Sequence, residues 1–430
     1  MILNLHNSNN INLLDKLESE YNNRLSTYRD MANYYEGKTK AKKEYAITDR
    51  SNRKASINYI KKFINEETSF AVGNSVSYVS EDSNKIKDIT KIINKQKSVL
   101  DTELVNTLGE FGTAYELRYL YNGELKIKII SPLYGIAYCN EQGQAELFMY
   151  FYHKELDDDT YMDVIDDKFI YKFKGKNKYN PLEVIPHYFN TVPVGVAKFM
   201  NEYKDTIYWD IHELQDIYEM TIWDSCNNIA DLRSSYLVLS GISIDDDDAK
   251  KMKQMGILQL PDANGKAEWL TKNLESDFCN SLTTKLEDLI YQISAHINHN
   301  VVMASNTSGV ALSSRLISLR NKVTVLQKSI QDCMESRLKD ICTYCNLTNN
   351  SNYDYSDIDI IFTMNLPQDD VSMAQIISQL SGKLPIETGL NQLSFVNNGS
   401  NEFNKMLEEQ KMIDNNLSSI NLDKEVDIDE

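Results

Sequence analysis

Two segments of helical periodicity, separated by one short break, constrain the fold of this chain most strongly. Apolar residues recur at three- and four-residue steps from Phe278 to Ile297, and again from Leu312 to Ile330. This is the period of one helix face. The break at 301–311, VVMASNTSGVA, contains Asn, Thr, Ser and Gly, which favour turns over helix. The pattern predicts an uncharged loop between two rigid helices and shows no grouping of residues typical of catalysis.

The rest of the chain mixes helical and strand periods, which predicts a helix-rich α+β protein. The period changes to two over 113–175, around an Asn122-Gly123 turn, and this predicts an antiparallel meander with one apolar face. Residues 353–367 read as a single strand that joins the meander. Residues 235–274 read as a small α/β unit. Further helices are predicted over 10–36, 58–73, 81–107 and 203–232, and two or three short ones over 370–412.

Charge and composition limit the classes of partner. The chain has 430 residues and a net charge of −18, whereas a protein that grips nucleic acid over its whole surface is usually basic. One stretch, 37–62, carries nine basic and two acidic residues. It is either a patch for nucleic acid or an acidic neighbour, or a solvated face. The sequence shows no signal peptide and no membrane-spanning run, so we expect the protein to stay in the cytoplasm where it is made, with no membrane partner.

Motifs for common chemistries are absent from the sequence. We find no P-loop, no G-x-G-x-x-G after a strand and no G-x-S-x-G. Cys342 and Cys345 have zinc-like spacing without a second ligand pair, and His296 and His299 read as partly exposed residues at a helix end. The acidic run Asp245–Asp248 lacks the alternating ligand positions of an EF-hand calcium loop. Acidic residues are favoured by the helix dipole at a helix N-terminus, so we interpret the run as the start of a helix. We therefore expect no enzymatic activity, metal or cofactor.

Several segments, in order along residues 10–412, resemble the portal proteins of tailed bacteriophages, of the type found in long-tailed phages of Gram-positive bacteria. The acidic end, 413–430, lies outside the resemblance and is predicted to be a disordered tail. The segments that carry the resemblance are NRKASINYIKKFINEETSFAVGNSVSY (52–78), ISPLYGIAY (130–138), HYFNTVPV (187–194), ADLRSSYLVLSG (230–241), GILQLPDANGKAEWLTK (256–272), SGVALSSRLISLRNK (308–322) and DIDIIFTMNLPQD (357–369).

The resemblance implies a ring, typically of twelve copies, at one capsid vertex of a virion. Double-stranded DNA would pass through its channel during packaging and ejection. The implied partners are the terminase large subunit, a head-tail adaptor, and the major capsid and scaffolding proteins. By order along the chain, the implied parts are a wing (1–200 and 312–369), two stem helices (201–234 and 275–300), a small α/β clip (235–274), a tunnel loop (301–311) and a helical crown (370–412).

The resemblance also implies which residues meet DNA and the motor. The tunnel loop facing DNA would comprise Val302, Met303, Ala304, Ser305, Asn306, Thr307, Ser308 and Gly309. The clip residues facing the motor or adaptor would be Asp245, Asp246, Asp247, Asp248, Lys250, Lys251, Asp262, Asn264 and Lys266. Residues 304–309 contain no Lys or Arg, so the loop is expected to act sterically, through backbone and hydroxyl groups.

Two other function classes remain open at this point. An acidic helical adaptor or scaffold protein without a channel explains the charge and the helices, though not an α/β unit between two long helices. A metal-dependent nuclease would use acids within 155–168 or 245–248. No His or Lys is paired with these acids in the sequence, so the nuclease ranks last.

Overall fold

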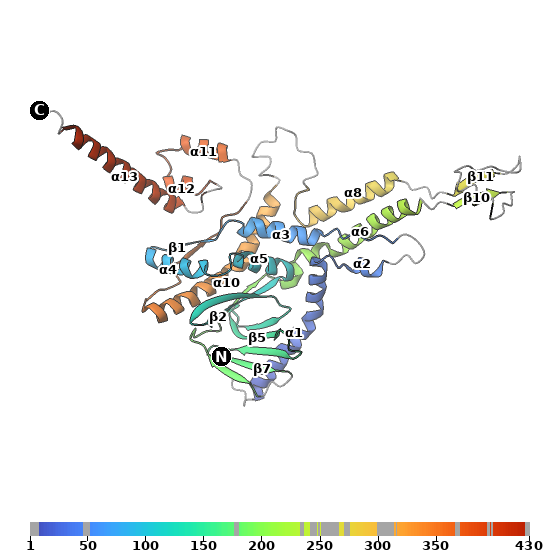
Figure 1. The fold of residues 1–430 in the computed structure, drawn as a ribbon, viewed down its shortest axis with the longest axis horizontal. Helices are drawn as coiled ribbons and strands as arrows, with labels where there is room; N and C mark the ends of the chain where they lie inside the picture. The colour runs from blue at the N-terminus through green and yellow to red at the C-terminus, as the bar shows by residue number, and fades with distance from the viewer. Residues whose placement is uncertain are drawn as a thin grey trace.

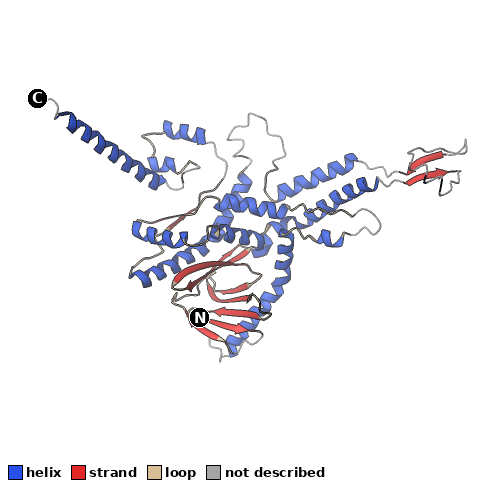
Figure 2. Cartoon of the chain, in the orientation of Figure 1, coloured by secondary structure: helices blue, strands red, loops and turns tan. Residues whose placement is uncertain are grey.

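The computed structural model shows an elongated molecule (Figure 1). A mixed α/β body lies at its centre, a helix pair ending in a hairpin extends to one side, and a helical segment extends to the other (Figure 2). Within the described residues, no helix is long and apolar enough to cross a membrane. The residues described are 8–45, 52–175, 180–232, 236–240, 247, 250, 266–270, 276–298, 314, 316–365, 370–393, 396 and 399–425.

The N-terminal helices follow the predicted periodicity with one exception. The predicted helix 81–107 is two helices, because the Gln96 side chain ends the first of them. Its amide donates to Leu125 O at 3.0 Å, and its carbonyl accepts from Ile127 N at 3.1 Å, which ties this point to a strand. The helices are α1 (Ser8–Tyr35), α2 (Lys40–Glu44), α3 (Tyr59–Val72), α4 (Ser83–Asn94) and α5 (Leu100–Phe111).

The predicted meander is divided into two sheets. The first has the strand order β3-β2-β9 and the second runs β4-β5-β6-β7-β8, and all their pairs are antiparallel. Strand β2 is central in the first sheet, between β3 and β9, and the strands between β3 and β9 in the chain form the second sheet. The strands are β2 (Thr113–Tyr121), β3 (Glu124–Ile130), β4 (Gly135–Cys139), β5 (Ala145–His153), β6 (Thr160–Ile165), β7 (Phe169–Lys174), β8 (Glu183–Pro186) and β9 (Val194–Lys198).

Both faces of the five-stranded sheet are covered, so the expectation of a single apolar face is wrong for it. Phe148 and Ile165 pack against Tyr115 of the three-stranded sheet on one side. On the other side, Leu14 of α1 packs against Met149. A strand buried on both faces is apolar in both alternating sets, which hides the two-residue period.

The late strand joins a different partner from the one predicted. Strand β12 (Asp359–Ile361) pairs antiparallel with β1 (Ser77–Val79) rather than with the meander. Two contacts hold it there. Ile358 is buried beside Ile89 of α4, and the Asp357 carboxylate lies 2.6 Å from the Lys85 ammonium. The strand is therefore placed by its packing against α4.

Helix α10 (Ile317–Asn349) crosses the body and is fixed to β2 by buried ion pairs. Arg337 donates to both Glu116 oxygens at 2.9 and 3.0 Å and to Asp101 at 2.7 Å. Arg118 donates to Asp340 at 2.7 Å. Both guanidinium groups and Glu116 are fully buried. Burial of charge is expensive unless every charge is paired, so these pairs fix the register of α10 on β2.

The C-terminal segment forms α11 (Asp370–Gln379), α12 (Ile386–Leu390) and α13 (Gly399–Glu425). The predicted disordered tail from 413 is wrong up to Glu425, because α13 continues through it. Residues 400–425 contain neither Gly nor Pro, and both residues are poor in helix interiors. Helix α13 is about 40 Å long at 1.5 Å per residue, and it projects away from the body (Figure 1).

Candidate functional site

Two antiparallel helices, which we call the stem, extend from the body and carry a hairpin at their far end (Figure 1). They are α6 (Ile207–Leu232) and α8 (Ser276–Ile293), and the hairpin pairs β10 (Tyr236–Ser240) with β11 (Lys266–Leu270). At the body, Ile211 of α6 and Ile290 of α8 are fully buried in a core that also contains Phe63 of α3. The stem is therefore anchored at one end and projects at the other.

One face of α8 is apolar and exposed. Phe278 is 64% exposed, Leu282 36% and Ile293 48%. At 100° per residue these three positions fall on one face with Leu286 and Ile290, which are buried in the core where the stem meets the body. The same face is therefore covered at that point and exposed at Phe278, Leu282 and Ile293. Large apolar side chains exposed on one helix face typically mark an interaction surface.

The described parts of the basic stretch, 37–45 and 52–62, contact α6 and are held to it by side chains of that helix. Glu219, which is fully buried, accepts from Thr39 Oγ1 at 2.7 Å and from Ile57 N at 2.8 Å. Further along α6, Asn227 bonds the backbone N–H and C=O of Arg53 at 2.8 and 3.2 Å. Burial raises the pKa of Glu219, while the Thr39 and Ile57 hydrogen bonds lower it. The stretch therefore braces the stem with its backbone and leaves many basic side chains at the surface.

A cluster of polar groups, which we call the junction, joins four elements where the stem meets the body. Lys322 of α10 lies 3.2 Å from Glu67 Oε1 of α3 and 3.9 Å from Asp210 of α6, and it donates to Ser294 O after α8 at 3.4 Å. His296 stacks on Phe63, with ring centroids 4.1 Å apart. Ser294 follows α8 and Lys322 lies near the start of α10, so the junction joins the chain on either side of the predicted loop 301–311, which itself lies outside the described residues.

The junction groups have perturbed ionisation. Burial raises the pKa of the Glu67 carboxyl, and the neighbouring Lys322 lowers it. Burial and Lys322 together lower the pKa of His296 to about 3, so the imidazole is neutral near pH 7. Glu67 therefore has its cation in Lys322 rather than in the histidine 3.8 Å away. The expectation that His296 is partly exposed is wrong, because it is buried against Phe63.

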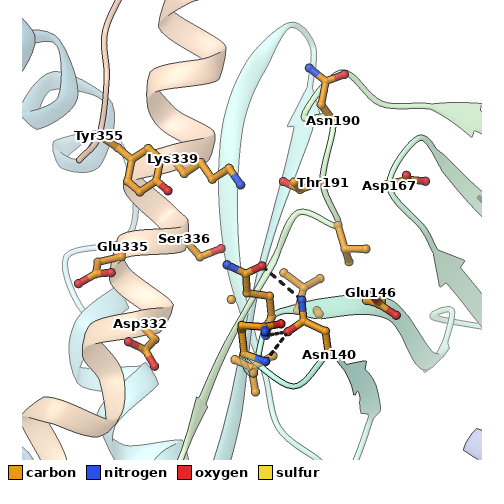
Figure 3. Close-up of a pocket in the computed structure, with 18 residues that line it drawn as sticks. Asn140, Glu146, Asp167, Asn190, Thr191, Asp332, Glu335, Ser336, Lys339 and Tyr355 are labelled. Carbon is orange, nitrogen blue, oxygen red and sulfur yellow. Dashed lines mark hydrogen bonds between the residues drawn. The ribbon is translucent and has the colours of Figure 1, made fainter. Parts of the chain in front are cut away.

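A polar cavity of about 370 Å³ lies between α10, β9 and the β4–β5 turn. The α10 carboxylates Asp332 and Glu335 lie on one side, and Glu146 and Asp167 lie on the other (Figure 3). The carboxylates do not converge on one point, and no histidine or cysteine lines the cavity. Among the residues that the structure describes, no group of three or more His, Cys, Asp or Glu side chains is placed to hold a metal ion.

The C-x-x-C pair lies inside the body. Cys342 and Cys345 are both buried on α10 and carry free thiols. Burial raises the pKa of Cys342 to about 12 and that of Cys345 to about 11. Thiols that stay protonated are poor nucleophiles and poor metal ligands, so these two residues serve as core.

The sequence matches the family described as "Phage portal protein, SPP1 Gp6-like" over residues 14–416. The chain belongs to this family. It is therefore a phage portal protein, a structural component of the virion rather than an enzyme. No curated protein sequence gives a significant match.

Solved structures from gene transfer agent (GTA) particles are similar to this portal protein at low identity. A chain of "Virion of native gene transfer agent (GTA) particle" has a TM-score of 0.45 and 10% identity, covering 77% of this chain and 88% of that one. A chain of "Neck of empty GTA particle computed with C6 symmetry" has 0.48 and 9%, covering 78% and 90%. A chain of "Neck of native GTA particle computed with C12 symmetry" has 0.47 and 9%, covering 78% and 89%.

The residues predicted to meet DNA and the motor are described only in small part. Val302–Gly309 of the loop lie outside the described residues, as do Asp245, Asp246, Asp248, Lys251, Asp262 and Asn264. Asp247 and Lys250 are described, and their charged groups lie 3.7 Å apart with side chains 83% and 75% exposed. Lys266 opens β11, opposite Ser240 of β10. Asp247 and Lys250 are therefore accessible to a partner.

The sequence contains a signal for the junction that a search for chemical motifs does not find. Glu67 falls on the same helical stripe as Ile60, Phe63, Ile64 and Ala71, all of which are buried. A carboxylate on a buried stripe requires a cation or a proton. The pattern predicts a partner for Glu67, but its identity, Lys322, lies 255 positions away and follows only from the fold.

Proposed function

We propose that this portal protein assembles into a ring whose central channel passes double-stranded DNA during packaging and ejection. The observation that supports this most is the exposure of Phe278, Leu282 and Ile293 on the apolar face of α8, beyond the part of that face that Leu286 and Ile290 bury in the body. These three side chains have no cover within the described chain. A second copy, rotated about a common axis, would bury them, and repetition of such a head-to-tail contact closes a ring.

The parts of the subunit follow the family order in this proposal. Residues 1–200 and 312–369 form the outer wing, and α6 and α8 form the stem around the channel. The α/β unit 235–274, with hairpin β10–β11, is the clip that docks the terminase large subunit and later the head-tail adaptor. Residues 370–412 form the crown inside the capsid, and the wing meets the capsid and scaffolding proteins.

The net negative charge of the protein is compatible with a channel through which DNA moves. With a net charge of −18, the subunits repel DNA phosphates, so a moving duplex is not retained on the walls. The tunnel loop 301–311 acts by shape, because Ala304–Gly309 carry no positive charge. Replacing Ser308 and Gly309 with Trp is expected to block packaging while rings still assemble. Normal packaging by that variant would overturn the steric role.

Negative-stain electron microscopy with native mass spectrometry tests the ring directly. We expect closed rings with a central opening of about 20 Å or more, the width of a duplex. Monomers or dimers at every concentration, with and without capsid and scaffolding protein, would refute the channel. They would leave the acidic adaptor or scaffold as the function.

A further inference from the structure

A row of lysines on α4 lines a groove on the wing. Lys87, Lys91 and Lys95 recur every four residues and are exposed, so they share one helix face. The groove beside them has a volume of about 800 Å³. It is bounded by β1 on one side, and Asn401 at the start of α13 also lines it. It is thus open to a large partner and lined by cations.

Most carboxylates near this face are already engaged elsewhere. The Asp82 side chain accepts from the backbone N–H groups of Asn84 and Lys85 at the start of α4, and Asp88 accepts from the Tyr353 hydroxyl at 2.9 Å. Lys95 lies 3.2 Å from Glu124. Within the described residues, no ion pair is present for Lys87 or Lys91. In a chain of net charge −18, these two lysines are thus available to a phosphate group.

Neutral hydrogen-bond donors flank the lysines. Asn84, Thr90 and Asn94 line the same groove. Exposed ammonium groups at helical spacing, flanked by hydroxyl and amide donors, are the groups that proteins use on phosphate oxygens. These groups are not arranged to contact base edges. We therefore expect them to bind the phosphate backbone of a nucleic acid without sequence specificity.

We propose that this groove binds the phosphate backbone of double-stranded DNA outside the channel. The assignment of that DNA to the packaged genome rests on the proposed function. Helix α4 lies on the side of the molecule that carries α13, opposite the hairpin β10–β11 (Figure 1). If α13 belongs to the crown inside the capsid, the groove faces the genome. The lysines would then tether DNA at the vertex, while the acidic surface elsewhere repels it.

The test is duplex binding by purified full-length protein, followed as fluorescence anisotropy of a short labelled DNA duplex over a range of salt concentrations. The variant is K87Q/K91Q. Each phosphate contact contributes about 0.9 to the slope of log affinity against log salt, so the slope is expected to fall by about 1.8. The wild-type affinity would then drop about 12-fold more than that of the variant between roughly 50 and 200 mM salt.

The control K16Q/K154Q removes the same charge from α1 and from the end of β5, where both lysines are exposed. It is expected to keep the wild-type slope. Equal slopes for the wild type and K87Q/K91Q, equal loss in the control, or no wild-type binding at low salt would each overturn the proposal. Electron microscopy of the same samples separates the two questions. Rings that bind no DNA overturn only the groove, and single subunits that show the lysine-dependent slope overturn only the ring.

Discussion

Replacement of Lys322 by Met tests whether the junction holds the stem to the body. Lys322 is the cation nearest to Glu67, at 3.2 Å, and the Glu67 side chain is only 3% exposed. Without Lys322 the carboxylate is buried unpaired, or it takes up a proton. Protonation of a glutamate with an ordinary pKa of 4.5 costs at most about 3.4 kcal/mol at pH 7, at 1.36 kcal/mol per unit. Because burial already raises the pKa of Glu67 in the wild type, part of this cost is present before the substitution. We therefore expect the free energy of unfolding to fall by about 1–3 kcal/mol near pH 7.

The sign of the pH dependence follows from the direction of the shift. Loss of Lys322 raises the pKa of Glu67 further above its value in the unfolded chain. The folded variant then holds a proton that the unfolded chain releases, so its stability falls as pH rises toward the new pKa. The deficit relative to wild type is expected to grow by up to about 1.4 kcal/mol per pH unit, and to be small near about pH 5.

Urea unfolding followed by tryptophan fluorescence, at about pH 5.5 and about pH 8, measures this deficit. Two controls accompany it. K328M removes an exposed lysine from the same helix and is expected to change stability by less than about 0.5 kcal/mol. E67Q/K322M removes both charges and is expected to recover most of the loss and to abolish its pH dependence. Wild-type stability in K322M, or a loss of the same size at both pH values, would refute the reasoning.

Three further predictions concern the body and the stem. Arg337→Met removes the closer of two buried guanidinium groups from Glu116 and leaves Arg118 at 3.9 Å. It is expected to cost about 3–5 kcal/mol in urea unfolding, with most of the loss recovered in E116Q/R337M. A loss below about 1 kcal/mol would show that Arg118 alone compensates Glu116. The low pKa of His296, about 3, means that wild-type stability falls as pH falls below 6.5, so H296Q is expected to lose about 2 kcal/mol less between about pH 7 and pH 5; parallel profiles would contradict this. L282E/I293E places charge on the exposed stripe of α8 and is expected to yield folded monomers by native mass spectrometry, whereas intact rings would exclude that stripe as the subunit contact.

Periodicity identified most elements because each helix or strand must bury one face locally. The stem helices, α10 and the Asn122-Gly123 hairpin all appear where the pattern predicts them. The misplaced elements share one cause. The ends of α4, the division of the meander and the pairing of β12 with β1 depend on partners distant in sequence. Gln96, for example, ends α4 by bonding the backbone of β3, and its sequence neighbours give no sign of that strand.

Residue order and composition alone established the family, the helix–loop–helix at the centre of the chain and the acidic, motif-poor character of the portal subunit. These are local properties, which can be read without knowing what lies nearby in space. Which charges meet was settled by the tertiary structure. It paired Glu67 with Lys322 and Arg337 with Glu116, and it placed Thr39 and Ile57 of the basic stretch against Glu219 of α6. Such ion pairs join residues more than 200 positions apart, and the cost of burying a charge is decided by what the fold places within a few ångströms of it.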